Sequence, residues 1–288
     1  MKSFYFAKTK LQLVPAATIL LALAISLSAQ TVTTFDAPGG GTGPGQGTYA
    51  TNINASGRII GFSRDANNAR HGFVRSQDGS FTIFDPPGAG TGAGQGTFPF
   101  AISQDGEITG FYTDGTNANH GFLFNKKGVI TTYDVPGAGT GPGQGTFGGG
   151  LTPNGTIMGN YFDADNLSHG FLMDRNGAFT TFDAPHAGNV PGSFQGTYPF
   201  GINTNGAITG WYVDEANVNH GFVRDKHGAL VEFDVPGAGT GPGQGPNVYS
   251  IAPNGAVTGF FLDSNNVVHG FLREAHGGSL GLPQFFGQ

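Results

Sequence analysis

The sequence predicts an all-β protein, and within that class a five-bladed β-propeller of four-stranded antiparallel blades. Three observations predict it. A unit of about 49 residues occurs five times. Short segments rich in Phe, Tyr, Ile, Thr and Val alternate with turn residues in every unit, and helical periodicity is absent after residue 29. Four strands in a repeated unit of about 40–50 residues are typical of a propeller blade.

The repeat is marked by the motif His-Gly-Phe, which recurs at spacings of 49, 49, 51 and 49 residues. In the third unit we expect strands at 148–153, 156–163, 169–174 and 178–183. Asn-Gly and Asp-Gly pairs separate the first two strands in the later units, and such pairs favour hairpins. Each fourth strand ends in a string like Thr-Phe-Asp, at Asp36, Asp85, Asp134, Asp183 and Asp234.

The repeats do not begin with their first strand. Residues 31–36 match a fourth strand, whereas the last unit stops after its third strand, "HGFLRE". We therefore expect residues 31–36 to complete the last blade and close the ring, which hides strand edges that otherwise invite aggregation. The propeller then spans 30–278, followed by a tail at 279–288. An open β-solenoid is the main alternative fold.

The first 29 residues have the pattern of a signal peptide. Lys2, Lys8 and Lys10 precede an apolar run that leads into small residues. We place cleavage after Ala29, with the bond after Ser28 as the alternative. This predicts a secreted, periplasmic or cell-envelope protein with no membrane insertion once the signal is removed. An uncleaved membrane anchor is the other interpretation of this segment.

Composition excludes several functions. Without the signal, 10 basic and 19 acidic residues give 10 − 19 = −9, which argues against nucleic acid and anionic membranes as partners. The chain has no Cys, so thiol chemistry and thiolate metal sites are excluded. The 52 Gly residues are compatible with disorder, but the regularly spaced 26 Phe indicate a packed core.

The repeat resembles a known family. "GxxxGxYxDxxxxxHGF", followed by "GxFTTFDxPGA", resembles the bacterial extracellular repeats named HAF after a His-Ala-Phe motif, although His-Gly-Phe stands here in all five copies. The resemblance covers 31–274. It implies secretion or an envelope location and no established reaction. The five-blade count also resembles tachylectin-like sugar-binding propellers, at the level of architecture.

Every unit carries the motif Asp-x-x-Asn-x-x-His between its second and third strands. It could form a ligand or metal site, but the simpler interpretation is structural, because Asp caps turn N–H groups and Asn tolerates the left-handed conformation. The His then begins the third strand, where it can hydrogen-bond a neighbouring Asp or a backbone carbonyl. A pairing with the Asp that ends the fourth strand is also open. We expect this structural role and no metal. The Asp and His residues are Asp65, His71, Asp114, His120, Asp163, His169, Asp214, His220, Asp263 and His269.

A Gly-rich string, "VPGAGTGPGQGTF" at 135–147 in its best copy, joins consecutive units. It lacks the Lys of a phosphate loop, the following helix of a dinucleotide site and the Asp of a calcium repeat. We interpret it as the crossover from a fourth strand to the next first strand. Its longest copy, at 185–197, departs most from the others.

In an antiparallel blade the crossovers and the Asp-x-x-Asn-x-x-His loops emerge on the same face. That face could carry five similar pockets suited to neutral polar ligands such as sugars, or only compact crossovers. The candidate ligand-binding residues are Gln46, Gln95, Gln144, Gln195, Gln244, Asn68, Asn117, Asn166, Asn217 and Asn266.

No catalytic residue is predicted. His-Glu-x-x-His is absent, and the single Gly-x-Ser-x-Gly match, around Ser279, lies in the Gly-rich tail without a following helix. We therefore expect a non-enzymatic binding module without a cofactor, with a glycan or an envelope protein as partner. The alternatives are a structural or protein-interaction scaffold of the envelope and a hydrolase with a site near the propeller axis. The oligomeric state stays open.

Overall fold

The computed structural model describes residues 32–275, so the predicted signal peptide at 1–29 and the tail at 279–288 lie outside the described residues. The described part contains nineteen β-strands and no helix, which confirms the all-β prediction. Accordingly, residues 32–275 hold no apolar helix with the length needed to cross a bilayer.

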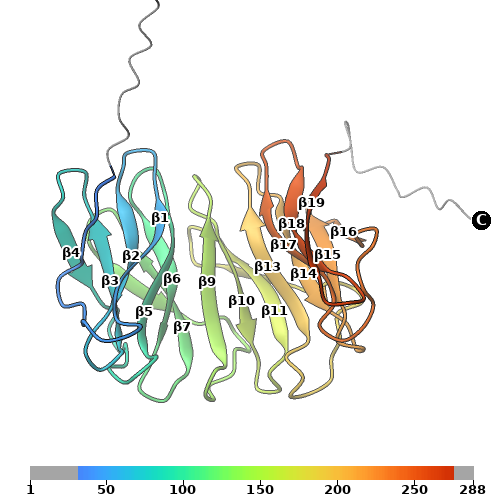
Figure 1. Ribbon diagram of the computed structural model, residues 1–288, viewed down its shortest axis with the longest axis horizontal. Coiled ribbons are helices and arrows are strands. Elements are labelled where there is room, and N and C mark those ends of the chain that lie inside the picture. The colour runs from blue at the N-terminus through green and yellow to red at the C-terminus, as the bar shows by residue number, and fades with distance from the viewer. Residues whose placement is uncertain (1–31, 276–288) are drawn as a thin grey trace, which may run out of the picture. The chain divides into compact units, whose positions relative to one another are not determined.

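Four repeats contribute four strands each and the fifth contributes three (Figure 1). The first repeat holds β1 (Gly47–Ile53), β2 (Ile59–Arg64), β3 (Arg70–Arg75) and β4 (Phe81–Phe84). The second holds β5 (Gly96–Ile102), β6 (Ile108–Thr113), β7 (Asn119–Phe124) and β8 (Ile130–Tyr133). The third holds β9 (Gly145–Leu151), β10 (Ile157–Phe162), β11 (Ser168–Met173) and β12 (Phe179–Phe182). The fourth holds β13 (Gly196–Ile202), β14 (Ile208–Val213), β15 (Asn219–Arg224) and β16 (Leu230–Phe233). The fifth holds β17 (Gly245–Ile251), β18 (Val257–Leu262) and β19 (Val268–Arg273).

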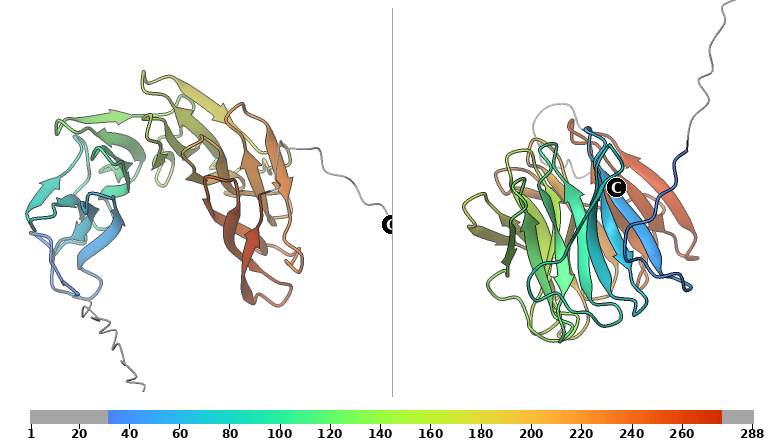
Figure 2. Two further views of the ribbon diagram at one scale, coloured as in Figure 1. Left: turned by 90° about the horizontal axis from the view of Figure 1, so that it is seen from above. Right: turned by 90° about the vertical axis from the view of Figure 1, so that its left-hand side faces the viewer.

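Strands within a repeat pair antiparallel in chain order. Single parallel bridges, such as Asn119 with Gly145, link the first four repeats into one sheet of sixteen strands. The strands of the fifth repeat form a separate sheet of three. Figure 2 shows the sheets following one another in chain order, with the first strands of neighbouring repeats adjoining. The first strand of the third repeat begins earlier than the sequence suggests. β9 starts at Gly145, inside the Gly-rich string, whereas the expected strand spans 148–153.

The His-Gly-Phe motif has a packing reason. The Phe side chains of the first four copies are fully buried between neighbouring strands, as at Phe122. A Cβ on the preceding glycine would collide with the aromatic ring that ends the fourth strand, so Gly121 accommodates Tyr133 and Gly170 accommodates Phe182. The glycine therefore lets a large ring lie directly across the third strand.

Two phenylalanines from repeats that are not neighbours meet at the first strands. The rings of Phe100 in β5 and Phe200 in β13 lie edge to face with their centres 5.6 Å apart. The intervening β9 has Gly149 at the corresponding position, so no side chain separates the two rings. Aromatic side chains of non-neighbouring repeats therefore meet in this region of the first strands.

Residues 32–36 form no strand among the described residues. Phe35 instead packs against the first repeat, with its ring 6.4 Å from that of Phe73 and 6.0 Å from that of Phe81. No strand pairing between this segment and β19 is present in the part of the chain that the structure describes. The five-blade count and the closure of the ring therefore stay predictions.

Candidate functional site

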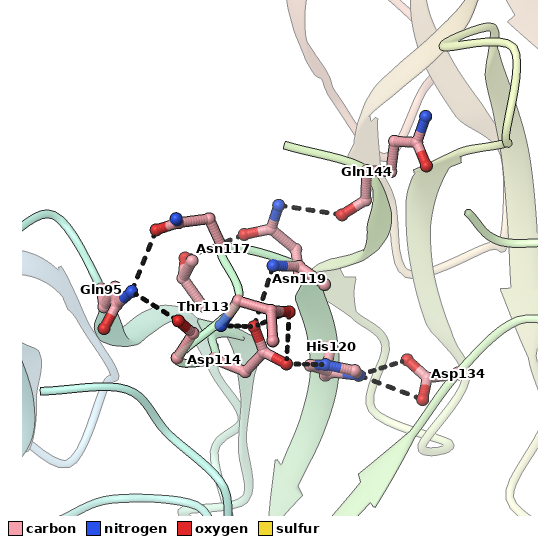
Figure 3. Close-up of polar contacts among 11 residues, drawn as sticks. Gln95, Thr113, Asp114, Asn117, Asn119, His120, Asp134 and Gln144 are labelled. Atoms are coloured by element: carbon pink, nitrogen blue, oxygen red, sulfur yellow. Dashed lines mark hydrogen bonds and ion pairs between the residues drawn. The ribbon is translucent and has the colours of Figure 1, made fainter. Parts of the chain in front are cut away.

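The His of each of the first four repeats lies between two carboxylates. His120 Nδ1 lies 2.9 Å from Asp134 and its Nε2 lies 3.4 Å from Asp114 (Figure 3). The His120 ring also stacks on that of Tyr112, with the ring centres 5.0 Å apart. Asp114 comes from the turn before the third strand, and Asp134 ends the fourth. The imidazole, which belongs to the third strand, therefore contacts both the turn before that strand and the end of the fourth strand of the same repeat. The same pairing with the fourth-strand Asp joins His71 to Asp85, His169 to Asp183 and His220 to Asp234.

Two of these histidines, His169 and His71, have a raised pKa. The hydrogen bond that His169 donates to Asp183 raises the pKa of His169 above its usual range, against a smaller opposing effect of burial. For His71, burial disfavours the charged ring, but the bonds to Asp85 and Asp65 outweigh it and the pKa is again raised. Both rings therefore hold a proton more readily in the folded chain than in the unfolded one.

The Asp and Asn of the motif build the turn itself. Asp114 Oδ1 accepts the N–H groups of Thr116 and Ala118, at 2.8 and 2.9 Å. The Asn that follows adopts a left-handed backbone in every repeat, with φ of 63, 70, 59, 63 and 62° for Asn68, Asn117, Asn166, Asn217 and Asn266. Asp65, Asp163, Asp214 and Asp263 accept N–H groups of their own turns in the same way.

The Gln of each crossover fastens the Gly-rich string to this turn. Gln95 Oε1 accepts the N–H of Gly92 at 2.9 Å, and its Nε2 donates to Asn117 Oδ1 at 3.0 Å and to the Gly115 carbonyl at 3.3 Å (Figure 3). Gln46, Gln144, Gln195 and Gln244 make corresponding bonds. The string and the turn therefore adjoin, and the amide of each Gln is occupied by internal partners. Ligand contact by these residues stays a prediction.

The longer crossover of the fourth repeat exposes an aromatic residue. Phe194 stands where the third crossover has Gly143, and it keeps the positive φ of that glycine, 57° against 82°. Its side chain is 54% exposed although its backbone is in a region that bulky residues rarely adopt. Val190 in the same crossover is 46% exposed.

A pocket that the sequence did not predict lies between the second and third repeats, at the opposite ends of the strands from the crossovers. Its volume is about 370 Å³, at the lower end of the range of roughly 300–1,000 Å³ found for small-molecule sites. The rings of Tyr133 and Phe179, with centres 6.1 Å apart, form two of its walls. Leu123, Leu151, Ile157 and Met173 complete its apolar surface.

The rim of the pocket is polar. The Arg175 guanidinium lies 3.4 Å from the Glu107 carboxylate, and Arg175 Nε donates to the Asn154 carbonyl at 2.9 Å. A Cβ at Gly155 would overlap the Arg175 side chain, so this glycine lets the arginine lie flat over the turn. The Glu107 side chain is only 16% exposed, whereas Arg175 is 59% exposed.

One residue of the third repeat explains why this interface is open. The position two residues after His-Gly-Phe is Met173 here, but Arg75, Arg224 and Arg273 in the first, fourth and fifth repeats. Arg224 lies over the Phe182 ring at 4.7 Å, and Arg273 lies over Phe233 at 5.0 Å. Phe124 fills the corresponding place in the second repeat by stacking on Phe84. This difference within the motif is the sequence signal that could have indicated the pocket.

Within the described residues, no group of three or more His, Asp or Glu side chains is arranged to hold a metal ion. The pocket contains the pair Glu107 and Arg175 together with Asp174, whose Oδ1 accepts two N–H groups of its own turn. This arrangement offers hydrogen-bond donors and acceptors beside an aromatic surface.

No protein-family model matches the chain, and no curated protein matches it significantly. Among solved structures, it is similar to a mutant of Aleuria aurantia lectin in complex with α-methyl-L-fucoside, with 13% identity and a TM-score of 0.47 over 80% of this chain and 74% of that one. The same mutant lectin in complex with Fucα1-6GlcNAc has 13% identity and a TM-score of 0.47, over 80% of this chain and 75% of that one. A candidate exo-β-1,3-galactanase from Bifidobacterium bifidum s17 has 12% identity and a TM-score of 0.35, over 79% of this chain and 92% of that one. At these TM-scores the similarity carries no argument about function.

Proposed function

We propose that the mature chain is a secreted five-bladed propeller of the HAF type that binds glycans, and that a sugar residue occupies the pocket between its second and third repeats. The observation that supports this proposal is the pocket itself, in which the rings of Tyr133 and Phe179 face a rim of Glu107 and Arg175.

A sugar ring has an apolar C–H face and a periphery of hydroxyl groups. Tyr133 and Phe179 offer apolar surface for the face, since aromatic rings combine a large contact area with few rotatable bonds. Glu107 accepts hydrogen bonds from hydroxyl groups, and the free N–H groups of the Arg175 fork donate to hydroxyl oxygens. A small ligand in an apolar site is oriented by a few polar groups of this kind.

The charges of the rim favour a neutral ligand. Glu107 and Arg175 offset one another at 3.4 Å, so a ligand with a carboxylate or an amine would compete with one member of the pair and leave the other without its partner. Neutral hydroxyl groups can bond to both without separating them.

The test is calorimetry of the mature domain with a panel of monosaccharides and cell-envelope polysaccharides. We expect Arg175→Met to weaken binding about 10- to 100-fold, because hydrogen bonds to charged groups contribute roughly 1.5–3 kcal/mol. Lys226→Met is the matched control, since Lys226 occupies the same turn position in the fourth repeat. Heat signals absent across the panel, or equal effects of the two variants, would contradict the proposal.

A second candidate function is a protein-interaction scaffold of the envelope. The exposed Phe194 and Val190 favour it, because exposed apolar residues held in a strained backbone conformation are often functional. Sedimentation with isolated envelope fractions separates the two functions. A scaffold loses binding in Phe194→Ser and keeps it in Arg175→Met, whereas a glycan-binding module shows the reverse. For a hydrolase with a site near the propeller axis, no observation in the described residues adds support.

Secretion is tested separately, by the mass of the protein recovered outside the cytoplasm. Cleavage after Ala29 gives a chain that begins with Gln30. A protein that retains residues 1–29 and stays with the membrane fraction would favour the uncleaved anchor.

A further inference from the structure

Two arginines of the first repeat lie opposite one another where the hairpin between β2 and β3 turns. Arg64 ends β2, Arg70 begins β3, and the two residues are partners in the strand register. Like charges placed directly opposite in a sheet are destabilising. This pair therefore lowers the stability of the hairpin unless a negative charge lies beside it.

The other four repeats place no charge at these two positions. In the second repeat the two residues satisfy each other, because Thr113 Oγ1 donates to Asn119 Oδ1 at 2.9 Å. The hairpin therefore forms without arginine, and the positive pair is specific to the first repeat. The corresponding pairs are Thr113 with Asn119, Phe162 with Ser168, Val213 with Asn219 and Leu262 with Val268.

The protein supplies no counter-charge to the two arginines. Neither guanidinium forms an ion pair with a carboxylate of residues 32–275. The adjacent Asp65 is occupied by its own turn, because its Oδ1 accepts the N–H groups of Asn67 and Ala69, at 2.9 and 2.8 Å. Its Oδ2 lies 3.6 Å from His71 Nε2. Both positive charges are thus left uncompensated within the described residues.

Most N–H donors of the two guanidinium groups also lack a partner. Arg64 Nη1 donates to the Gly45 carbonyl at 3.4 Å, and Arg70 Nη1 donates to the Gly94 carbonyl at 2.8 Å, both at the exposed side of the hairpin. The two Nε atoms are buried and have no hydrogen-bond partner among the described residues. Since a guanidinium carries five N–H donors, several remain for a ligand.

Aromatic rings hold the two guanidinium groups near one another. Arg64 Cζ lies 5.1 Å from the centre of the Tyr49 ring and 5.9 Å from that of Phe62. Arg70 Cζ lies 5.8 Å from the centre of the same Phe62 ring. Burial lowers the pKa of Arg70, and the charge of Arg64 lowers it further. The two charges are thus close enough to repel one another.

We propose that Arg64 and Arg70 form a binding site for one oxyanion group, the carboxylate, sulfate or phosphate of an acidic ligand. Arginine forks bind such groups through parallel N–H···O bonds, and charge-assisted bonds are about twice as strong as neutral ones. A bound anion also removes the repulsion between the two guanidinium groups. The site lies beside the crossovers that contain Gly45 and Gly94, and it shares no residue with the sugar pocket.

The test is an NMR titration at constant ionic strength, with sodium acetate, sodium sulfate and sodium phosphate as separate probes and sodium chloride as the reference. We expect saturable shifts of the Arg64 and Arg70 N–H signals with at least one probe. Acetate identifies a carboxylate site, and sulfate or phosphate a site for a tetrahedral anion. No saturable shift with any of the three probes overturns the proposal.

Arg70→Met should weaken this binding about 10- to 100-fold, because a hydrogen bond to a charged group contributes roughly 1.5–3 kcal/mol. Arg58→Met is the matched control, since Arg58 has the same charge in the same repeat but lies in the turn between β1 and β2, at the opposite end of the strands. Equal weakening in both variants overturns the proposal, because it shows a general effect of net charge.

Arg64→Met is a second variant, chosen because its one hydrogen bond among the described residues is long, at 3.4 Å. Loss of the like charge should keep or raise Tm in chloride, while the additional gain in Tm caused by the binding anion is lost. Arg58→Met corrects for the general stabilisation of proteins by sulfate and phosphate. A gain in Arg64→Met as large as that of the wild-type protein overturns the proposal.

Discussion

The guanidinium of Arg224 lies 4.7 Å from the centre of the Phe182 ring, and this contact fills the interface between the third and fourth repeats. One interface earlier the corresponding residues are Met173 and Tyr133, which line a pocket of about 370 Å³. Met173 has an uncharged thioether in place of the guanidinium, so it makes no cation–π contact with the Tyr133 ring. The interface that holds this pocket therefore differs from the next one at a single position of the repeated motif.

Met173→Arg closes the pocket. We expect its guanidinium to lie over Tyr133, as Arg224 lies over Phe182, and a cation–π contact of this kind contributes about 0.5–2 kcal/mol. The variant therefore keeps or raises Tm and loses sugar binding by more than about tenfold. Calorimetry and thermal unfolding measure the two effects.

The control for this prediction is Arg224→Met, which removes the arginine from the other interface and leaves Tyr133 and Phe179 untouched. Sugar binding at the original pocket should then be unchanged. Binding that survives Met173→Arg with a wild-type constant would show that the ligand lies elsewhere.

Gln195→Ala should lower stability without lowering sugar affinity. Gln195 is 1% exposed, its Oε1 accepts the N–H of Val190, and its Nε2 donates to the Glu215 carbonyl and to Asn217. Leaving such buried partners unpaired costs about 1–3 kcal/mol. Urea unfolding measures the loss, and calorimetry the affinity.

Gln46→Ala is the milder counterpart, because Gln46 is less buried and its bond to the Ala66 carbonyl is exposed. A loss of sugar affinity in either variant, in a protein that stays folded, would move the site to the face of the crossovers.

Stability should fall as pH rises above neutrality, owing to the histidine pairs. Asp183 raises the pKa of His169 above its unfolded value of about 6.5. A raised folded pKa stabilises the fold fully below the unfolded pKa, and this contribution is lost as pH increases through the folded pKa. Urea unfolding at several pH values from about 6 to about 9 measures the slope.

Asp183→Asn removes the charge that causes this shift, so its free energy of unfolding should depend less on pH over the same window. An unchanged slope, or a stability that increases with pH in the wild-type protein, would show that His169 is not the group involved.

Phe194→Gly should raise the free energy of unfolding by about 1 kcal/mol, because a bulky residue at positive φ stores roughly 1–3 kcal/mol of strain. Part of the gain is offset by the lost contact with Phe162, whose ring centre is 5.7 Å away. Chemical denaturation measures the change. The reverse substitution, Gly143→Phe at the matched position with φ of 82°, should lower stability. Equal stability of all three proteins would mean that the backbone there carries no strain.

Local patterns in the sequence predicted much of the repeat. The turn at Asp114 and Asn117, the hairpins at Asn-Gly pairs and the all-β class follow from residue preferences that act within a few positions. The pairing of His120 with Asp134 was left open, because it depends on the register of two strands 14 residues apart in sequence. The start of β9 at Gly145 was not predicted for a similar reason, since a glycine with a φ of 104° resembles a turn residue until its partner strand is known.

The sequence alone determined the repeating unit, its strand order and the adjacency of crossover and turn, because these follow from chain connectivity and local backbone chemistry. Tertiary structure alone decided where a cavity remains. That outcome depends on whether the side chain two positions after His-Gly-Phe fills the space beside a ring of the previous repeat, as Arg224 does and Met173 does not. This difference depends on side-chain volume and on packing across two repeats, so the repeat pattern alone does not predict it.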